Sequence, residues 1–383
     1  MSELLPTRRR LLIVSDTSMF RKTGQIFALG PVVREINALL PLFDHITWIG
    51  FNQPKYVEDP SFTVVDTSKT RLILLPKCGG DRFGDKVIVL LRTPWMLLQI
   101  WLEMLHHEVV YTRAPSAPAF IATLLSFFFS KKIFWHKYAG NWIQHPAPRF
   151  FAVQRSLLKK ASNSKVTING QWPDQAAHCL SFENPCLDQS EFEQGEVVSN
   201  QKDFEGSLEF CFVGRLEAAK GVQWILEALK TLPSNTNIAA LHLVGDGPMR
   251  QECEALAATS KIPIHVYGFL GQDAVHKIMI RSHILLLPSA AEGFPKVVAE
   301  AANLGCIPMV SDVSCISQYI RHGENGFLLD PILLPQGQLS ALISNLPEPA
   351  TLKKMATRAH SICSFFTYEH FVERVKREIL RPN

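Results

Sequence analysis

Two carboxylates, Glu292 and Glu300, stand eight positions apart in the stretch AEGFPKVVAEA at residues 291–301. Pro295, between them, fits the first position of a helix, where its missing N–H has no cost. The helix then begins near Phe294, with Glu300 in its second turn and Glu292 on the loop before it. Because carboxylates only accept hydrogen bonds, the pair suits a ligand that offers hydroxyl donors at two depths of one cleft.

Two cations follow an apolar run that has the pattern of a strand. In VGRLEAAKG, Arg215 comes directly after the run at 208–214, and Lys220 lies five residues further on, at the mouth of a helix. A Gly-Asp-Gly turn at 245–247 opens another helix. Arginine offers a fork of donors and lysine a compact charge, so this set suits a diphosphate.

The helix that begins near Phe294 adds backbone donors to these side chains. N–H groups at a helix start bind anions, and the helix dipole contributes roughly 0.3–1 kcal/mol. With Pro295 at the first position, the N–H groups of Lys296 and Val297 can point at a phosphate. A nucleotide sugar would use both kinds of group, since it joins a diphosphate to two hydroxyl-bearing rings.

The elements that must position these residues are strands and helices in alternation. In the first half, strand-like runs fall at 10–15, 45–51, 71–75, 108–112, 132–138 and 165–168. In the second half they fall at 208–214, 239–245, 264–269, 283–289 and 306–311. Helical patterns separate them, which is typical of parallel sheets that bind ligands beyond the carboxyl ends of their strands. The predicted fold class is α/β, with two Rossmann-like, doubly wound parallel-sheet domains.

The domain boundaries are predicted from composition. Residues 188–206 are polar and acidic without a hydrophobic period, so we interpret them as a linker between a domain at 1–187 and one at 207–366. Residues 1–187 carry 22 Lys and Arg against 13 Asp and Glu, whereas 188–383 carry 17 against 22. The terminal helix at 367–383 has apolar residues every four positions and is expected to pack back on the first domain.

Length and composition limit the classes of protein to which the chain can belong. A chain of 383 residues with 47% hydrophobic and 19% charged residues suits two globular domains. The eight cysteines form no C-x-x-C pair, so we predict buried thiols and no metal site. No secretory segment is apparent, and we expect a cytoplasmic protein with no nucleic-acid partner.

Two apolar runs leave an alternative open. The runs at 87–105 and 120–129 are interpreted as core helices, because the first contains Arg92, Pro94 and Glu103 and the second is too short to span a bilayer. The alternative is a surface that dips into a membrane interface. The basic first half is equally consistent with chance and with an anionic partner, such as phospholipid headgroups or a lipid diphosphate.

Six blocks of the second half carry a family resemblance. GRLEAAKG, LVGDGPMR, VYGFL, LLLPSAAEGFPKVVAEA, GCIPMVSD and HGENGFLLDP, in this order over residues 208–331, resemble the donor domain of glycosyltransferase family 4. The resemblance implies the GT-B fold, in which two such domains face a central cleft. It also implies a retaining enzyme dependent on a nucleotide sugar, with no metal and no other cofactor.

The resemblance assigns roles to individual residues. It implies that Arg215 and Lys220 hold the diphosphate and that Glu300 binds the ribose hydroxyls. Glu292, with the backbone of Gly293 and Phe294, would hold the transferred sugar. The stretch Gly268, Phe269 and Leu270 would lie by the base. Family members often have glycine where this chain has Pro295, so the sugar preference is expected to differ.

The first half of the chain shows a weaker resemblance to the family. The stretch after the first strand resembles the loop that closes over the donor phosphate, with Gly24 as the position of close approach. His136 is a candidate catalytic residue, and its alternative is a packed core histidine. Arg113 is a candidate for contacting the acceptor or a phosphate, and its alternative is a structural ion pair.

The predicted reaction moves a sugar from a nucleoside diphosphate sugar to the hydroxyl of a saccharide or lipid-linked acceptor. Surface-polysaccharide assembly, with peripheral contact to an anionic membrane, is the setting that the resemblance favours. A nucleotide-sugar epimerase and a non-catalytic carbohydrate-binding subunit are the alternatives. A dehydrogenase is disfavoured because no G-x-G-x-x-G turn follows the first strand.

Overall fold

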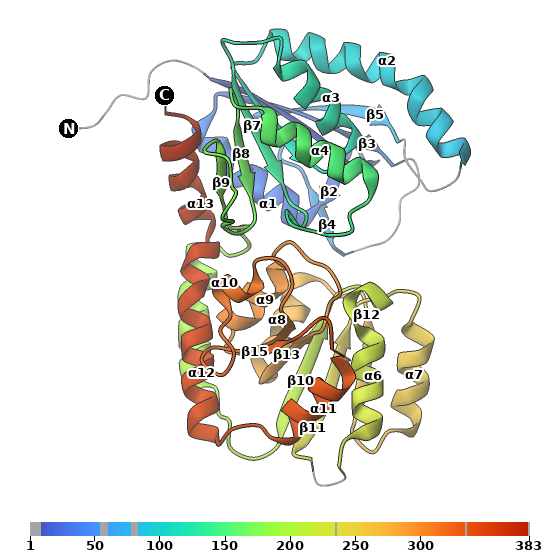
Figure 1. Cartoon of the computed structure of the whole chain (residues 1–383), viewed down its shortest axis with the longest axis vertical. Helices are drawn as coiled ribbons and strands as arrows, with labels where there is room; N and C mark the ends of the chain where they lie inside the picture. Colours follow the sequence, from blue (N-terminus) through green and yellow to red (C-terminus); the bar gives the residue numbers. More distant parts are fainter. Residues whose placement is uncertain (1–8, 54–59, 78–82, 234–235, 334, 382–383) are drawn as a thin grey trace, which may run out of the picture. The chain divides into compact units, whose positions relative to one another are not determined.

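The computed structural model describes the chain at residues 9–53, 60–77, 83–233, 236–333 and 335–381, without the side chains of 83–87 and 90. The chain divides into two compact units (Figure 1). Unit 1 comprises the chain up to Phe182 and the residues from Val372 onward. Unit 2 comprises Glu183–Phe371.

Unit 1 is built on a parallel sheet in the order β5-β3-β1-β6-β7-β8-β9. The chain moves outward from β1 through β3 to β5, and then returns to the other side of β1 with β6. The order therefore reverses between β1 and β6. Its strands are β1 (Arg10–Lys22), β3 (His45–Asn52), β5 (Thr70–Pro76), β6 (Val109–Ala114), β7 (Ile133–Tyr138), β8 (Lys165–Ile168) and β9 (Cys179–Ser181).

Helices follow the strands of unit 1, as the alternation predicts. Leu12 and Val14 of β1 share a core cluster with Met96, Ile100 and other apolar residues of the helices that follow β5 and β6. The helices of unit 1 are α1 (Gly30–Leu39), η1 (Leu40–Leu42), α2 (Phe83–Leu105), α3 (Ala117–Ser126) and α4 (Arg149–Lys160).

The segment after the first strand of unit 1 differs from its prediction. β1 continues to Lys22 and pairs antiparallel with β2 (Gln25–Leu29), which in turn pairs with β4 (Phe62–Val64). Thr23 and Gly24 form the turn of this hairpin, both with positive φ, at 48° and 81°. Gly24 is therefore needed for the turn. A Cβ added there would meet no protein atom within 4 Å, and the approach of Gly24 to a donor phosphate stays a prediction.

Unit 2 has a sheet of parallel strands in the order β12-β11-β10-β13-β14-β15. The order reverses between β10 and β13, as it does between β1 and β6 in unit 1. The strands are β10 (Leu208–Val213), β11 (Ile238–Val244), β12 (Ile264–Gly268), β13 (Ile284–Leu287), β14 (Ile307–Ser311) and β15 (Phe327–Leu329).

Helices separate most of the strands of unit 2. In α6, Val222, Ile225 and Leu226 are buried and Leu229 is half-buried, as the predicted stripe requires. The helices are η2 (Ala218–Lys220), α6 (Val222–Thr231), α7 (Arg250–Thr259), α8 (Gln272–Arg281), α9 (Lys296–Asn303), α10 (Ile316–Tyr319), α11 (Pro335–Ser344), α12 (Pro349–Ser361) and η3 (Ile362–Phe366).

The predicted linker at 188–206 is largely a helix. Helix α5 (Gln189–Gln201) begins with a capping box, in which Asp188 accepts from the N–H of Glu191 and Glu191 reaches back to the N–H of Asp188. Polar contacts dock it: the amide of Asn303 in α9 donates to the carbonyl of Glu191, and Lys353 in α12 donates to carbonyls at its C-terminal end. The linker prediction is wrong because polar groups and caps fix α5, and these leave no hydrophobic period.

The C-terminal segment begins in unit 2 and ends in unit 1. It comprises α13 (Tyr368–Arg374) and a π-helical turn, η4 (Val375–Ile379), and the boundary between the units falls at Val372. Within unit 1, the guanidinium of Arg374 lies 3.9 Å from the ring centroid of Phe182, and Arg9 donates to the carbonyl of Leu380.

Candidate functional site

The candidate site of unit 2 lies where its strand order reverses. The loops after β10 and β13 leave the carboxyl ends of adjacent strands. Ligands of doubly wound sheets bind at such a point. The predicted residues Arg215 and Lys220 lie on the first loop, and Glu292, Gly293 and Phe294 lie on the second.

The two loops touch through their backbones. The N–H of Ala290 donates to the carbonyl of Ala219 at 3.0 Å. Gly221 follows Lys220 with φ of 75°, and a Cβ there would overlap the carbonyl of Pro288. Glycine is therefore required at the start of α6, because only hydrogen fits between the loops. This contact fixes the position from which Lys220 extends.

Lys220 and Glu292 form the central ion pair of the site. The ammonium of Lys220 donates to Glu292 Oε1 at 2.5 Å, although the residues are 72 positions apart in the sequence. The side chains are 29% and 11% exposed. The carboxylate can accept a hydrogen bond from a ligand hydroxyl, and the ammonium next to it can neutralise a ligand anion.

Arg215 lies at the same edge but is held differently. Its Nε donates to Glu217 Oε2 at 2.6 Å, and its side chain is 60% exposed. The prediction placed Arg215 and Lys220 together on a diphosphate. The structure gives each cation its own carboxylate, and Arg215 is free to turn because an exposed pair is worth little.

The Gly-Asp-Gly turn after β11 has a structural role. Asp246 accepts from the N–H of Gly247 at 2.7 Å and from Arg250 at 3.1 Å. The turn contacts the first loop, since the N–H of Leu216 donates to the carbonyl of Asp246. Asp246 thus shapes its turn and supports the loop that carries Arg215 and Lys220.

Helix α9 begins one residue later than predicted. Pro295 is the N-cap, with φ of −73° and ψ of 122°, and Lys296 and Val297 occupy the first turn. Phe294 is buried, and its ring stacks on Phe366 at 4.5 Å, so only its backbone is available to a ligand. Glu300 lies in the second turn of α9 and is half-buried.

The stretch assigned to the base closes β12. Gly268 ends the strand, and its carbonyl accepts from the N–H of Gly245 at 2.8 Å. Phe269 follows with a side chain that is 52% exposed, and Leu270 is half-buried. An exposed aromatic ring at a strand end offers a stacking surface for a flat ligand.

Unit 1 has its own hollow, of about 400 Å³, at the point where its strand order reverses. Asp16 and Thr17 from β1 line it, with Arg113 and Pro115 at the end of β6 and Ala139 after β7. Asp16 is absent from the predicted site residues. Its place directly after the first strand-like run is the signal in the sequence that could have identified it.

Arg113 lines this hollow and is also part of a buried ion-pair network. It donates to Glu35 Oε1 at 2.5 Å, and the ammonium of Lys137 lies 2.9 Å from both oxygens of Glu35. The hydroxyl of Tyr111 donates to the same carboxylate at 2.7 Å. Burial opposes the charge of Arg113, but Glu35 and Tyr111 together outweigh burial and raise the pKa of the guanidinium. The structural ion pair, the alternative for Arg113, is therefore present.

His136 is a core residue. It has no exposed surface, and its Nδ1 lies 2.8 Å from the hydroxyl of Thr112 on the neighbouring strand. Burial lowers the pKa of His136 to about 3. The structure favours the packed alternative, so His136 leaves the catalytic candidates.

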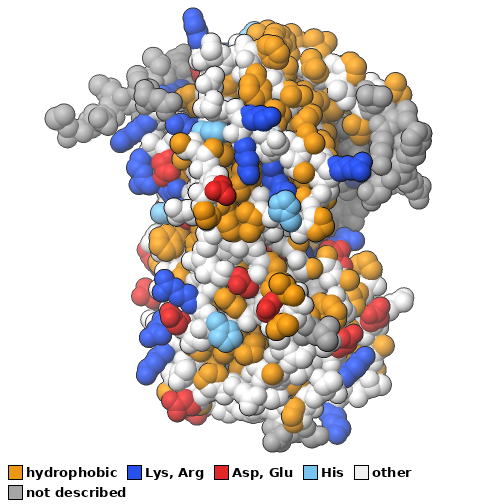
Figure 2. Space-filling model, in the orientation of Figure 1, with side chains coloured by type: hydrophobic (Ala, Val, Ile, Leu, Met, Phe, Trp, Pro, Cys, Tyr) orange, Lys and Arg blue, Asp and Glu red, His pale blue; other side chains and the backbone are white. Residues whose placement is uncertain are grey.

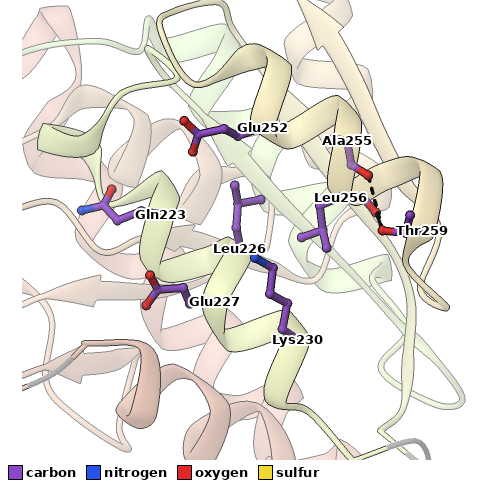
Figure 3. Close-up of a pocket in the computed structure, with 8 residues that line it drawn as sticks. All are labelled: Gln223, Leu226, Glu227, Lys230, Glu252, Ala255, Leu256 and Thr259. Atoms are coloured by element: carbon purple, nitrogen blue, oxygen red, sulfur yellow. Dashed lines mark hydrogen bonds between the residues drawn. The ribbon is translucent and has the colours of Figure 1, made fainter.

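A second hollow of unit 2, of about 380 Å³, lies between α6 and α7 (Figure 3). Gln223 and Lys230 line it from α6, and Glu252 and Thr259 line it from α7. Neither Lys220 nor Glu292 is among the residues that line this groove, so we treat it separately from the candidate site. Among the described residues, no group of three or more His, Cys, Asp and Glu side chains could hold a metal ion.

Comparisons with known proteins agree with the fold. Residues 196–361 match the family described as glycosyl transferases group 1. Alpha-D-kanosaminyltransferase of Streptomyces kanamyceticus is 22% identical over 228 residues, which is 57% of this chain and 58% of that protein. Lipopolysaccharide 1,6-galactosyltransferase of Salmonella typhimurium is 32% identical over 144 residues, 35% of this chain and 39% of that protein. The matched region thus spans less than two thirds of these relatives.

The similarity of fold covers the whole chain. The structure of HepE from Anabaena in complex with UDP has a TM-score of 0.65 and 15% identity, and the match covers 96% of this chain and 98% of that one. The predicted fold, two Rossmann-like domains of the GT-B type, is confirmed. Residues 196–361 are thus similar to group 1 glycosyltransferases, the class of enzyme that the sequence predicts.

Proposed function

From the group 1 glycosyltransferase match of residues 196–361, we propose that the protein transfers a sugar from a nucleoside diphosphate sugar to an acceptor hydroxyl. The observation that carries the proposal is the Lys220–Glu292 pair at the point of strand reversal. Glu292 accepts from hydroxyls of the transferred sugar, and Lys220 turns from Glu292 to the diphosphate. When the nucleotide sugar binds, charge-assisted hydrogen bonds between it and the two side chains replace the internal ion pair.

The remaining donor contacts follow from the same loops. Arg215 exchanges Glu217 for a phosphate oxygen, and the first turn of α9 directs its dipole at the diphosphate. Glu300 accepts from the ribose hydroxyls, and the Gly268–Leu270 stretch contacts the base. UDP, which HepE binds, is the first nucleotide to test.

In the proposed reaction, the bond between the anomeric carbon and the diphosphate breaks with retention of configuration. The negative charge of the leaving diphosphate grows in the transition state, so cations already in place supply the largest stabilising term. The departing phosphate oxygen accepts the proton of the attacking hydroxyl. We propose that protein cations and N–H groups stabilise the diphosphate without a metal.

The acceptor is proposed to be a saccharide or a lipid-linked saccharide in surface-polysaccharide assembly. Asp16 and Arg113, which line the hollow of unit 1, offer an acceptor and a donor of hydrogen bonds to sugar hydroxyls. The lipopolysaccharide galactosyltransferase among the relatives supports this setting. A cytoplasmic location stays a prediction.

The test is a thermal-shift panel of the whole protein with UDP, GDP and ADP, with and without EDTA. A nucleotide at a hundred times its Kd should add about 2.7 kcal/mol to the unfolding free energy. The variant Glu292→Gln should then lose affinity for the nucleotide sugar and keep affinity for the nucleotide alone. The proposal fails if no nucleotide stabilises the wild type. A shift abolished by EDTA would overturn the metal-free part of the proposal alone.

A further inference from the structure

Helix α2 turns a stripe of apolar side chains toward solvent. Its opposite face packs into the core of unit 1 through Met96, Ile100 and Met104. The outward residues recur at alternating spacings of three and four, so they lie on one face of the helix. They are between 42% and 74% exposed, and comprise Ile88, Leu91, Trp95, Leu98, Leu102 and Leu105. The prediction of a core helix is therefore right for one face of α2 and wrong for the other.

The apolar stripe continues onto the end of α3. Leu124, Phe127 and Phe128 are 42%, 53% and 75% exposed. Phe129, next in the chain, packs on Trp101 of α2 with ring centroids 4.9 Å apart, so the two helix ends are neighbours. We call these three residues and the six of the α2 stripe the α2–α3 apolar face. Figure 2 shows hydrophobic side chains gathered over this end of unit 1.

The charged residues within 88–105 are turned away from the stripe. Arg92 donates to the backbone carbonyl of Lys77, and Glu103 is paired with Arg71 on β5. The outward stripe thus consists of apolar side chains alone. Contiguous exposed apolar residues on a folded domain mark sites that contact another protein or a membrane.

Positive charge predominates in the chain that follows α2, where Glu108 is paired with Arg10. Between Glu108 and Asp174 the sequence has no carboxylate and nine Lys and Arg residues. Lys131 is exposed three positions after Phe128, and α4, which packs on α3 through Phe120 and Phe150, ends in the exposed pair Lys159 and Lys160. The surroundings of the α2–α3 apolar face would therefore attract a negatively charged partner.

We propose that the α2–α3 apolar face docks unit 1 on an anionic lipid surface. The stripe of α2 lies in the interface plane with its side chains among the upper acyl chains, and the lysines contact anionic headgroups. A bilayer fits better than a protein partner because the face combines a long apolar stripe and a tryptophan with exposed lysines nearby. None of the helices in the described part of the chain has the length and hydropathy of a membrane span.

The first experiment measures co-sedimentation of the whole protein with vesicles of phosphatidylcholine containing 30% phosphatidylglycerol. The double variant Leu91→Ser and Phe128→Ser should lower the partition coefficient at least tenfold, because it removes the two most exposed side chains of the face. The matched control is Ile332→Ser with Leu333→Ser, which removes two exposed apolar residues of unit 2 and should leave binding unchanged.

The second experiment separates charge from apolar contact. The triple variant Lys131→Gln, Lys159→Gln and Lys160→Gln should bind the anionic vesicles at least tenfold more weakly, since each lysine near the surface contributes about fivefold. Binding to vesicles of pure phosphatidylcholine should not change. The control, Lys261→Gln with Lys354→Gln, removes two exposed lysines of unit 2.

A third measurement needs no destabilising change. Lipids brominated near the headgroup should quench the fluorescence of Trp95, and Trp95→Phe should lose that part of the quenching. Three results would each overturn the proposal: no vesicle binding by the wild type, binding that survives Leu91→Ser with Phe128→Ser, or a wild-type dimer that this variant converts to a monomer. Vesicle binding needs no nucleotide, so its failure is distinguishable from a failure of the proposed transferase activity.

Discussion

Strands β5-β3-β1-β6-β7-β8 of unit 1 follow the same order as the sheet of unit 2, but the two sheets use the edge at their strand ends differently. In unit 2, Lys220 and Glu292 reach each other from two loops and stay partly exposed, where a ligand can separate them. In unit 1, Arg113 and Lys137 lie on adjacent strands, and both are tied to the fully buried Glu35 of α1. In unit 2 the ion pair can be replaced by contacts with a ligand. In unit 1 the ion pairs hold helix α1 on the sheet.

A charged residue at a strand end can therefore belong to a ligand site or to the structural core. Where the partner carboxylate lies on a loop, the ion pair can separate, because water can solvate each of the two charged groups. Where it comes from a packed helix, removing one partner leaves a buried charge uncompensated. The strand-end position alone does not separate a ligand-binding cation from a structural one.

The largest expected effect comes from breaking the buried network of unit 1. Glu35→Ala leaves Arg113 and Lys137 without their carboxylate, so the unfolding free energy of unit 1 should fall by about 3–5 kcal/mol. Urea unfolding followed by tryptophan fluorescence measures this. The control, Glu108→Ala, breaks the exposed pair with Arg10 and should cost less than about 1 kcal/mol. Equal losses in the two variants would contradict a structural role for Glu35.

The corresponding change in unit 2 should act on activity more than on stability. Lys220→Ala should lower kcat/KM about tenfold to a hundredfold, because one charge-assisted bond to the diphosphate is worth about 1.5–3 kcal/mol. Steady-state kinetics with the nucleotide sugar found by the thermal-shift panel measures the loss. The matched control is Lys230→Ala, in the groove between α6 and α7 (Figure 3). If Lys230→Ala has the larger effect, the nucleotide binds in that groove.

His136 gives unit 1 a pH dependence of stability. The unfolded histidine takes up a proton below about pH 6.5, whereas burial lowers its pKa in the folded protein to about 3. The unfolded state therefore binds more protons in this window, and the unfolding free energy falls as the pH decreases from about 6.5 toward 3.

His136→Asn removes this titration. The slope of unfolding free energy against pH should become shallower by about 1.4 kcal/mol per pH unit between pH 4 and 6. Urea titrations at several pH values measure the slope in both proteins. Other histidines with lowered pKa values, such as His107 and His242, are present in both and cancel. Parallel slopes would mean that His136 is protonated in the folded state.

The parts of the structure that could be predicted from sequence are those set by local residue types. Apolar runs located the strands, and glycine and proline located the loops that bring Lys220 to Glu292. The parts that were missed depend on distant partners. Glu35 meets Lys137 across 102 positions, and α5 is docked by Asn303 and Lys353 without a hydrophobic period. Its capping box, Asp188 with Glu191, was the local signal that could have revealed the helix.

Two glycines, Gly24 in unit 1 and Gly221 in unit 2, have nearly equal φ, 81° and 75°. Gly24→Ala should cost about 1 kcal/mol of unfolding free energy, because a Cβ is disfavoured at positive φ but meets no neighbouring atom there. Gly221→Ala adds an overlap with the carbonyl of Pro288, so it should cost more and also weaken nucleotide binding by separating the loops of Lys220 and Glu292. Paired urea and thermal-shift measurements separate the two contributions. Equal costs, with nucleotide binding intact in both variants, would show that the contact between these loops does not position the ion pair.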